Sequence, residues 1–246
     1  MSDKTEDNSK HKSHKGMRVK ARLLDTYYGH VSRDMKLIVI TGSTGKVTTA
    51  HFVHSILAEA GEHVAVLASD DEIKVGMLHK FLSDAWKAGA SYIVVTAPAK
   101  SIASEVFFKL PIHVVALTDY VPSHLEDATA ADYEAATDTL FDMDPEITVV
   151  NSDDINYKTF RSFKGTKASL TYGHDYYASV RIEGSQLYKK GTEAQLNIDG
   201  HRETVASFCP GEPVVAYMAC AAAIANALKI DDDTIIAGIA AYEPEA

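Results

Sequence analysis

Residues 36–61 read KLIVITGSTGKVTTAHFVHSILAEAG, and this stretch decides the fold. The apolar, β-branched run Lys36–Ile40 is typical of a buried parallel strand. Apolar residues at positions 52, 53, 56 and 57 then follow the spacing of one helix face, and Gly61 supplies a stop signal. A strand is therefore expected to lead through the loop TGSTGK directly into a helix.

That loop lies where a phosphate-binding loop belongs. Its glycines let backbone amides face an anion, the helix N-terminus adds a positive end, and Lys46 can reach a terminal phosphate. The general pattern GxxxxGK[ST] fails, because Ile40 stands six residues before Lys46 and Val47 replaces the hydroxyl residue that would bind magnesium. The alternative is a glycine-containing turn with an incidental lysine.

Strands and helices alternate on the C-terminal side of this stretch. We predict further strands at 63–69, 91–97, 113–119 and 147–151, and helices around 77–89 and 131–141. Such alternation predicts an α/β fold in which a mostly parallel sheet of the P-loop type is covered by helices on both faces.

The last third of the chain has a different pattern. Residues 169–208 form short alternating segments separated by Gly or Asp turns, which predicts a small antiparallel β-subdomain appended to the main sheet. A buried helix at 216–230 and a shorter one at 234–242 follow. The polar residues 1–16 are expected to form a disordered tail, which leaves 17–246 as the folded domain.

Composition limits the classes of partner. The net charge of −10 argues against a general nucleic-acid surface or an anionic membrane surface. No run approaches the roughly 18 to 20 apolar residues of a membrane span, and a signal peptide is not indicated, so we predict a cytoplasmic protein without nucleic-acid or membrane partners. Cys209 and Cys220 are predicted to be reduced packing residues.

The loop resembles that of the Mur ligases and the related folylpolyglutamate synthetases, which reads roughly T-G-[TS]-N-G-K-T-T-[TS]. The matching positions are Gly42, Gly45, Lys46, Thr48 and Thr49. Four later segments resemble further family motifs in the same order: AWKAGASYIVVTAPAKS, HVVALTDYVPSHLEDATAADYEAATDTLF, ITVVNSDD, and the stretch from TYG to CPGEPVVAYMACAAAIANALKI. The resemblance implies the central ATP-binding domain of this family.

In that family, ATP phosphorylates a substrate carboxylate and an amine attacks the acyl phosphate, while two magnesium ions hold the phosphates. The resemblance thus implies ATP as the nucleotide and Mg²⁺ as the metal. The candidate nucleotide-binding residues are Gly42, Ser43, Thr44, Gly45, Lys46, Val47, Thr48, Asn151 and Asp154. His124 is the candidate catalytic residue, and Thr48 and His124 are the candidate metal ligands.

Several family positions carry other residues here. The hydroxyl after the loop lysine is Val47, the magnesium-binding Glu falls on Thr96, and the carbamylated Lys falls on Thr137. Uncharged side chains are poor ligands for a hard cation, so the two-metal site is expected to be dismantled.

Departures continue beyond the metal positions. The Asn of the family's "T-N" is Asp119, and its paired Asn positions for the base are Val214 and Tyr217. Asn151 and Asp154 match "N-x-D-D", although an Asx turn with a purely local role is an equal alternative.

Three hypotheses follow. The first is a Mur-ligase-like nucleotide-binding module, a pseudoenzyme linked to peptidoglycan-precursor metabolism, in which the family's N-terminal substrate domain and C-terminal ligase domain are absent. The second is an active ATP-dependent amide ligase that is completed by a protein partner or by the missing domains themselves. The third is an unrelated P-loop ATPase or GTPase that uses Asp119 as its metal-binding Asp.

Overall fold

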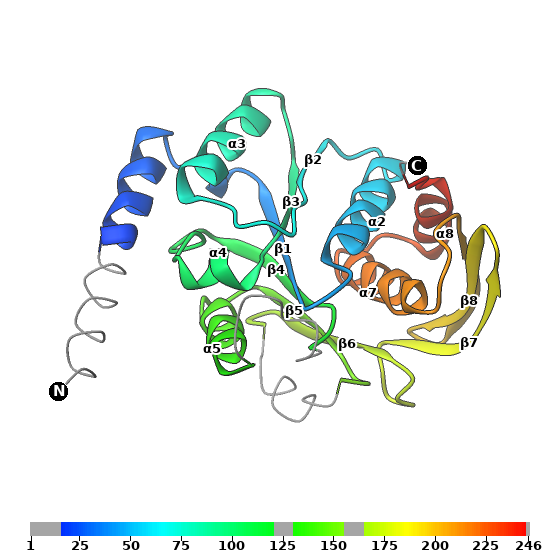
Figure 1. Ribbon diagram of the computed structural model, residues 1–246. Helices are drawn as coiled ribbons and strands as arrows, with labels where there is room; N and C mark the ends of the chain where they lie inside the picture. The colour runs from blue at the N-terminus through cyan, green and yellow to red at the C-terminus, as the bar shows by residue number, and fades with distance from the viewer. Residues whose placement is uncertain (1–15, 121–129, 155–164, 245–246) are drawn as a thin grey trace.

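A single mixed sheet organises the chain (Figure 1). The computed structural model describes residues 16–120, 130–154 and 165–244. In this part of the chain the sheet has nine strands in the order β2-β3-β1-β4-β5-β6-β7-β8-β9. Their bounds are β1 (Lys36–Thr41), β2 (Val64–Leu67), β3 (Tyr92–Thr96), β4 (Ile112–Leu117), β5 (Ile147–Asn151), β6 (Ala168–Gly173), β7 (Val180–Tyr188), β8 (Gly191–Ile198) and β9 (His201–Ser207).

The β1 strand lies near the middle of the sheet and sets its two faces. Because successive side chains point to opposite sides of a strand, Ile38 and Ile40 join one apolar core while Leu37 and Val39 join the other. Figure 1 shows α2, α7 and α8 over the first face and α3, α4 and α5 over the second. The helices are α2 (Lys46–Glu59), α3 (Val75–Lys87), α4 (Ala99–Ala103), α5 (Ala130–Phe141), α7 (Pro213–Ala227) and α8 (Asp232–Ala241).

Parallel pairing runs from β2 to β7, and this confirms the predicted α/β class. The boundary predicted for the antiparallel part was wrong, since β6 is parallel to β5 and only β7, β8 and β9 pair antiparallel. These strands are continuous with the main sheet, to which the sequence analysis expected an antiparallel part to be appended, and they curl around α7 and α8 (Figure 1). The sheet continues past β6 because β6 would otherwise be an edge strand with unpaired amide and carbonyl groups, and β7 pairs with those groups.

Gly184 is one of the glycines in 169–208 that the sequence analysis expected to form a turn, but it lies inside β7. The register against β8 shifts between Ile182 and Gly184, which marks a β-bulge. Glycine accommodates the local distortion of a bulge without ending the ladder, so one strand forms where two segments were expected.

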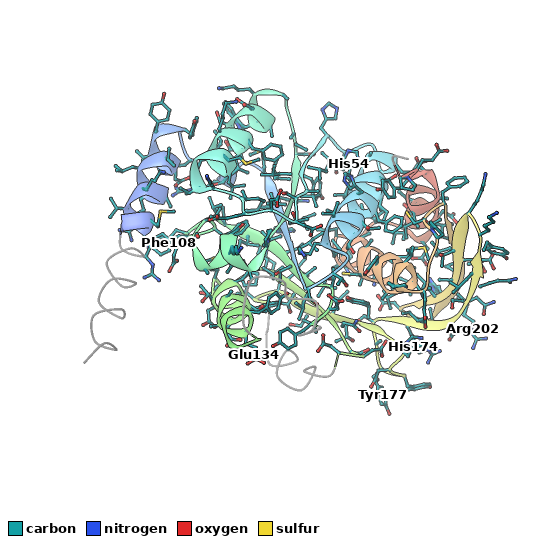
Figure 2. The ribbon with its side chains drawn as sticks, in the orientation of Figure 1. His54, Phe108, Glu134, His174, Tyr177 and Arg202 are labelled. Atoms are coloured by element: carbon teal, nitrogen blue, oxygen red, sulfur yellow. The ribbon has the colours of Figure 1, made fainter. Side chains whose placement is uncertain are left out.

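Residues 16–27 form a helix that packs beside α4. The guanidinium of Arg18 lies 2.7 Å from Glu105 and 5.0 Å from the ring centroid of Phe108, a residue labelled in Figure 2. Residues 1–15 of the predicted tail lie outside the described residues. Among the described residues, no helix is both long and apolar enough to cross a membrane.

Candidate phosphate-binding site

The loop between β1 and α2 has the backbone conformation that its glycines permit. Gly42 has a φ of 147° and Gly45, the N-cap of α2, has a φ of 74°. A Cβ atom at Gly42 would lie 1.8 Å from Oγ1 of Thr118, and one at Gly45 would lie 2.0 Å from Cε1 of Tyr217. Both positions therefore require glycine for conformation and for space.

Strand β4 holds the loop from the side. The Thr118 amide donates to the Thr41 carbonyl at 2.9 Å, and the Thr118 hydroxyl donates to the Thr44 carbonyl at 2.6 Å. The adjacency of β1 and β4 in the sheet brings these residues together, because the carboxyl ends of parallel strands meet at one edge. The loop is thus fixed at its first residue and at its middle.

A carboxylate lies inside this loop. One oxygen of Asp119 accepts hydrogen bonds from the Thr44 amide at 2.8 Å and from the Ser43 hydroxyl at 2.9 Å. The other oxygen accepts from the Thr44 hydroxyl at 2.5 Å. These donors are of the kind that a phosphate-binding loop offers to an anion.

Tyr217, from α7, covers the other side of the loop. Its hydroxyl lies 3.2 Å from Thr44 Oγ1, and its ring stands against the Cα of Gly45. Burial raises the pKa of Tyr217, so the phenol stays neutral near pH 7. The family resemblance placed Tyr217 only at an expected base-binding position, whereas the structure places it against the loop between β1 and α2.

Lys46 begins α2 and is largely buried, with 7% of its side chain exposed. Its Nζ lies 3.1 Å from Oδ1 of Asp70, whose side chain is 73% exposed. Sequence reasoning missed Asp70, because its position after β2 carries no motif. The pair therefore joins a buried lysine to a solvent-exposed carboxylate.

The expected metal positions do not supply ligands for a hard cation. The hydroxyl of Thr96 donates to the Ser69 carbonyl at 2.7 Å and accepts from the Ser69 amide at 2.8 Å, so it joins the ends of β2 and β3. Thr137 is buried and uncharged, and Val47 is apolar. Within residues 16–120, 130–154 and 165–244, no group of three His, Cys, Asp or Glu side chains could hold a metal ion. The described residues therefore do not fit a two-magnesium centre.

Asn151 ends β5 and Asp154 follows it, and both contact residues just after β4. The Asn151 side chain accepts from the Asp153 amide at 2.9 Å, which is an Asx turn, and donates to the Thr118 carbonyl at 3.3 Å. Asp154 accepts from the Tyr120 amide at 2.5 Å. Both side chains thus brace the strand ends around the loop.

Two of the predicted site residues remain, Thr48 and His124. Thr48 is half-buried in the first turn of α2, next to Val47 and Lys46. His124 lies outside the described residues. Asp153, which shares the Asn151 turn, pairs with His174 at 2.7 Å on the loop after β6 that also carries Tyr177 (Figure 2).

Comparison with known proteins assigns most of the chain to one family. The family model described as the Mur ligase middle domain matches residues 40–225. A UDP-N-acetylmuramoyl-L-alanyl-D-glutamate--2,6-diaminopimelate ligase of Clostridium tetani is 26% identical over 200 residues, which cover 76% of this chain and 41% of that ligase. This chain spans about half the length of the curated relatives it matches.

Solved structures share the fold. A MurF crystal structure from Acinetobacter baumannii superposes with a TM-score of 0.76 at 18% identity, covering 93% of this chain and 50% of that one. A Mycobacterium tuberculosis folylpolyglutamate synthase complexed with ADP and AMPPCP has a TM-score of 0.73 at 12% identity, covering 92% and 63%. The family-model match covers most of the chain, so the hypothesis of an unrelated P-loop ATPase or GTPase is wrong.

Proposed function

This chain belongs to the Mur ligase family through the middle domain, and from that premise we propose that it binds the phosphates of ATP or ADP at the loop Gly42–Lys46. The observation that carries the proposal is the loop itself. Glycines with positive φ at 42 and 45 open the backbone, and the buried Lys46 stands at the start of a 14-residue helix. Amides, helix N-terminus and lysine together favour a phosphate.

The ADP and AMPPCP complex of a structural neighbour supports a nucleotide as the ligand. The names of the curated relatives support a link to peptidoglycan-precursor metabolism. Our proposal includes a cytoplasmic location, where ATP is available.

Ligation is a separate step, and we propose that the chain does not perform it alone. Acyl-phosphate formation requires the charge on the transferring phosphoryl group to be neutralised, usually by metal ions. The hydroxyl of Thr96 is already used by the Ser69 backbone, and Thr137 offers only a buried neutral hydroxyl. Nucleotide binding without ligation is the function that these side chains support best.

The test is calorimetric titration of ADP and ATP, with and without magnesium, into the wild-type chain and Lys46→Ala. A charge-assisted hydrogen bond contributes about 1.5–3 kcal/mol, so we expect Lys46→Ala to weaken binding by about tenfold or more. Lys87→Ala removes an exposed lysine at the end of α3 and should leave the affinity unchanged. Equal affinity of Lys46→Ala and wild type would refute the phosphate site.

A second assay addresses ligation. The chain is incubated with ATP, a UDP-muramoyl peptide and an amino acid, with and without a candidate partner protein, and released phosphate is measured. We expect no release above that of Lys46→Ala. Lys46-dependent release by the chain alone would refute the proposal, and Lys46-dependent release that requires the partner would support the active amide ligase that acts with a partner.

A further inference from the structure

The Asp119 carboxylate sits among the donors that a nucleotide phosphate would use. It accepts hydrogen bonds from the Thr44 amide and from the hydroxyls of Ser43 and Thr44, at distances between 2.5 and 2.9 Å. We infer that Asp119 is an internal anion of the phosphate loop and determines which ligands the loop accepts. The inference rests on the proposed function, since it concerns the same loop.

The loop cannot easily offer these donors to two anions at once. Thr44 is held at all of its polar groups: its amide and hydroxyl bind Asp119, its hydroxyl also contacts Tyr217, and its carbonyl accepts from Thr118. A phosphate that takes the Thr44 amide must displace the carboxylate or lie beside it. Displacement loses three hydrogen bonds, and proximity brings like charges together.

No nearby cation offsets the Asp119 charge within the described residues. Lys46, the basic residue of the loop, pairs with Asp70. The contacts of the Asp119 carboxylate come from neutral groups, namely the Thr44 amide and three hydroxyls, of which that of Thr118 is the most distant at 3.5 Å. The carboxylate therefore lowers the affinity of the loop for an anion that arrives without a cation.

Asparagine is the matched replacement for Asp119. Its Oδ1 can still accept from the Thr44 amide, so Asp119→Asn keeps the size and one loop contact while it removes the charge.

A role as a metal ligand makes the opposite prediction. If Asp119 bound magnesium together with the nucleotide, Asp119→Asn would weaken binding in magnesium and leave binding in EDTA unchanged. If Asp119 occupies the loop, the same change strengthens binding of metal-free ADP. One pair of titrations separates the two roles.

The experiment is calorimetric titration of ADP in EDTA, and then in magnesium, into wild type, Asp119→Asn and Asp119→Ala. Asp142→Asn, an exposed residue after α5, is the control with the same change in charge. Thermal unfolding of each variant verifies that it is folded. Should both Asp119 variants be unfolded, hydrogen exchange of the Thr44 amide in the wild-type chain replaces them: ADP must alter its protection if the carboxylate is displaced.

We expect Asp119→Asn to bind ADP in EDTA at least tenfold more tightly than wild type, and Asp142→Asn to match wild type. If Asp119→Asn binds no more tightly while wild-type binding still depends on Lys46, the inference is wrong and the proposed phosphate site stands. If no variant binds ADP, both are wrong. If only the Asp119 variants bind ADP, and adding Lys46→Ala to them abolishes that binding, the inference holds. In that case the Asp119 carboxylate prevents the wild-type loop from binding ADP.

Discussion

Lys46 Nζ lies 3.1 Å from Asp70 Oδ1, and the two side chains differ sharply in exposure: 7% for the lysine and 73% for the aspartate. An exposed partner is well solvated and contributes little to stability, typically about 0–1 kcal/mol. The pair therefore holds the lysine in place without binding it strongly.

Asp70→Asn should strengthen phosphate binding. The change removes a carboxylate that competes with phosphate for Lys46, and an energy of up to about 1 kcal/mol corresponds to an affinity gain of up to about fivefold. Calorimetric titration of ADP measures the gain, which should vanish at high salt. Asp71→Asn is the control, because Asp71 is the neighbouring exposed aspartate and the ion pair with Lys46 is made by Asp70. Weaker binding by Asp70→Asn would show that the carboxylate positions the lysine productively.

Gly238→Ala should destabilise the packing of α8 against α2, the helix that follows the loop. A Cβ at Gly238 in α8 would lie 2.4 Å from the Cα of Ile56 in α2, so the two helices must separate. Overpacking of this kind costs about 1–3 kcal/mol, measured as a lower midpoint in urea unfolding.

The control for this change is Gly76→Ala in α3. No atom lies within 4 Å of a Cβ at Gly76, and alanine favours a helix over glycine by up to about 1 kcal/mol. This variant should be as stable as wild type or slightly more so. Equal stability of both alanine variants would mean that α2 and α8 are not in close contact.

His79→Leu should reduce the loss of stability at acidic pH. Burial lowers the pKa of His79, so below about pH 6.5 the unfolded chain takes up a proton that the folded chain resists. Stability from the neutral histidine is fully present above that pH, falls as the pH drops toward the folded pKa, and stays lost below it.

Urea unfolding of wild type and His79→Leu between pH 8 and pH 5 tests this sign. The variant should lose less stability, by about 1.4 kcal/mol for each unit of pKa lowering. Burial also lowers the pKa values of His54 and His113, so the unfolding free energy of both proteins still depends partly on pH. Parallel curves would contradict the prediction.

Both thiols should be unreactive in the folded chain. Cys209 and Cys220 are free and buried, and burial raises the pKa of the Cys220 thiol to about 12. Because the thiolate is the reactive form, an aromatic disulfide reagent at pH 8 should label neither thiol quickly in the native protein and both in denaturant. Rapid native labelling of Cys220 would indicate local opening around α7.

Much of the fold could be predicted because its signals are local. The run Lys36–Ile40, the loop glycines and the helix periodicity after them lie within 26 residues of sequence, and each follows from backbone preference and burial. The bulge at Gly184 could not be predicted, since a glycine between polar residues favours a turn equally well until a partner strand fixes the register. The same holds for the parallel pairing of β6.

By itself the sequence determined the α/β architecture and the glycine-containing loop after its first strand. The phosphate-binding role of that loop and the loss of metal ligands at Val47, Thr96 and Thr137 stay predictions. Only the tertiary structure decided what surrounds the loop. Asp119 is 75 residues from Thr44, and Tyr217 is 173 residues from it. Their contacts exist because β4 lies beside β1 and α7 packs over the same edge, an arrangement set by the crossing order of the whole sheet.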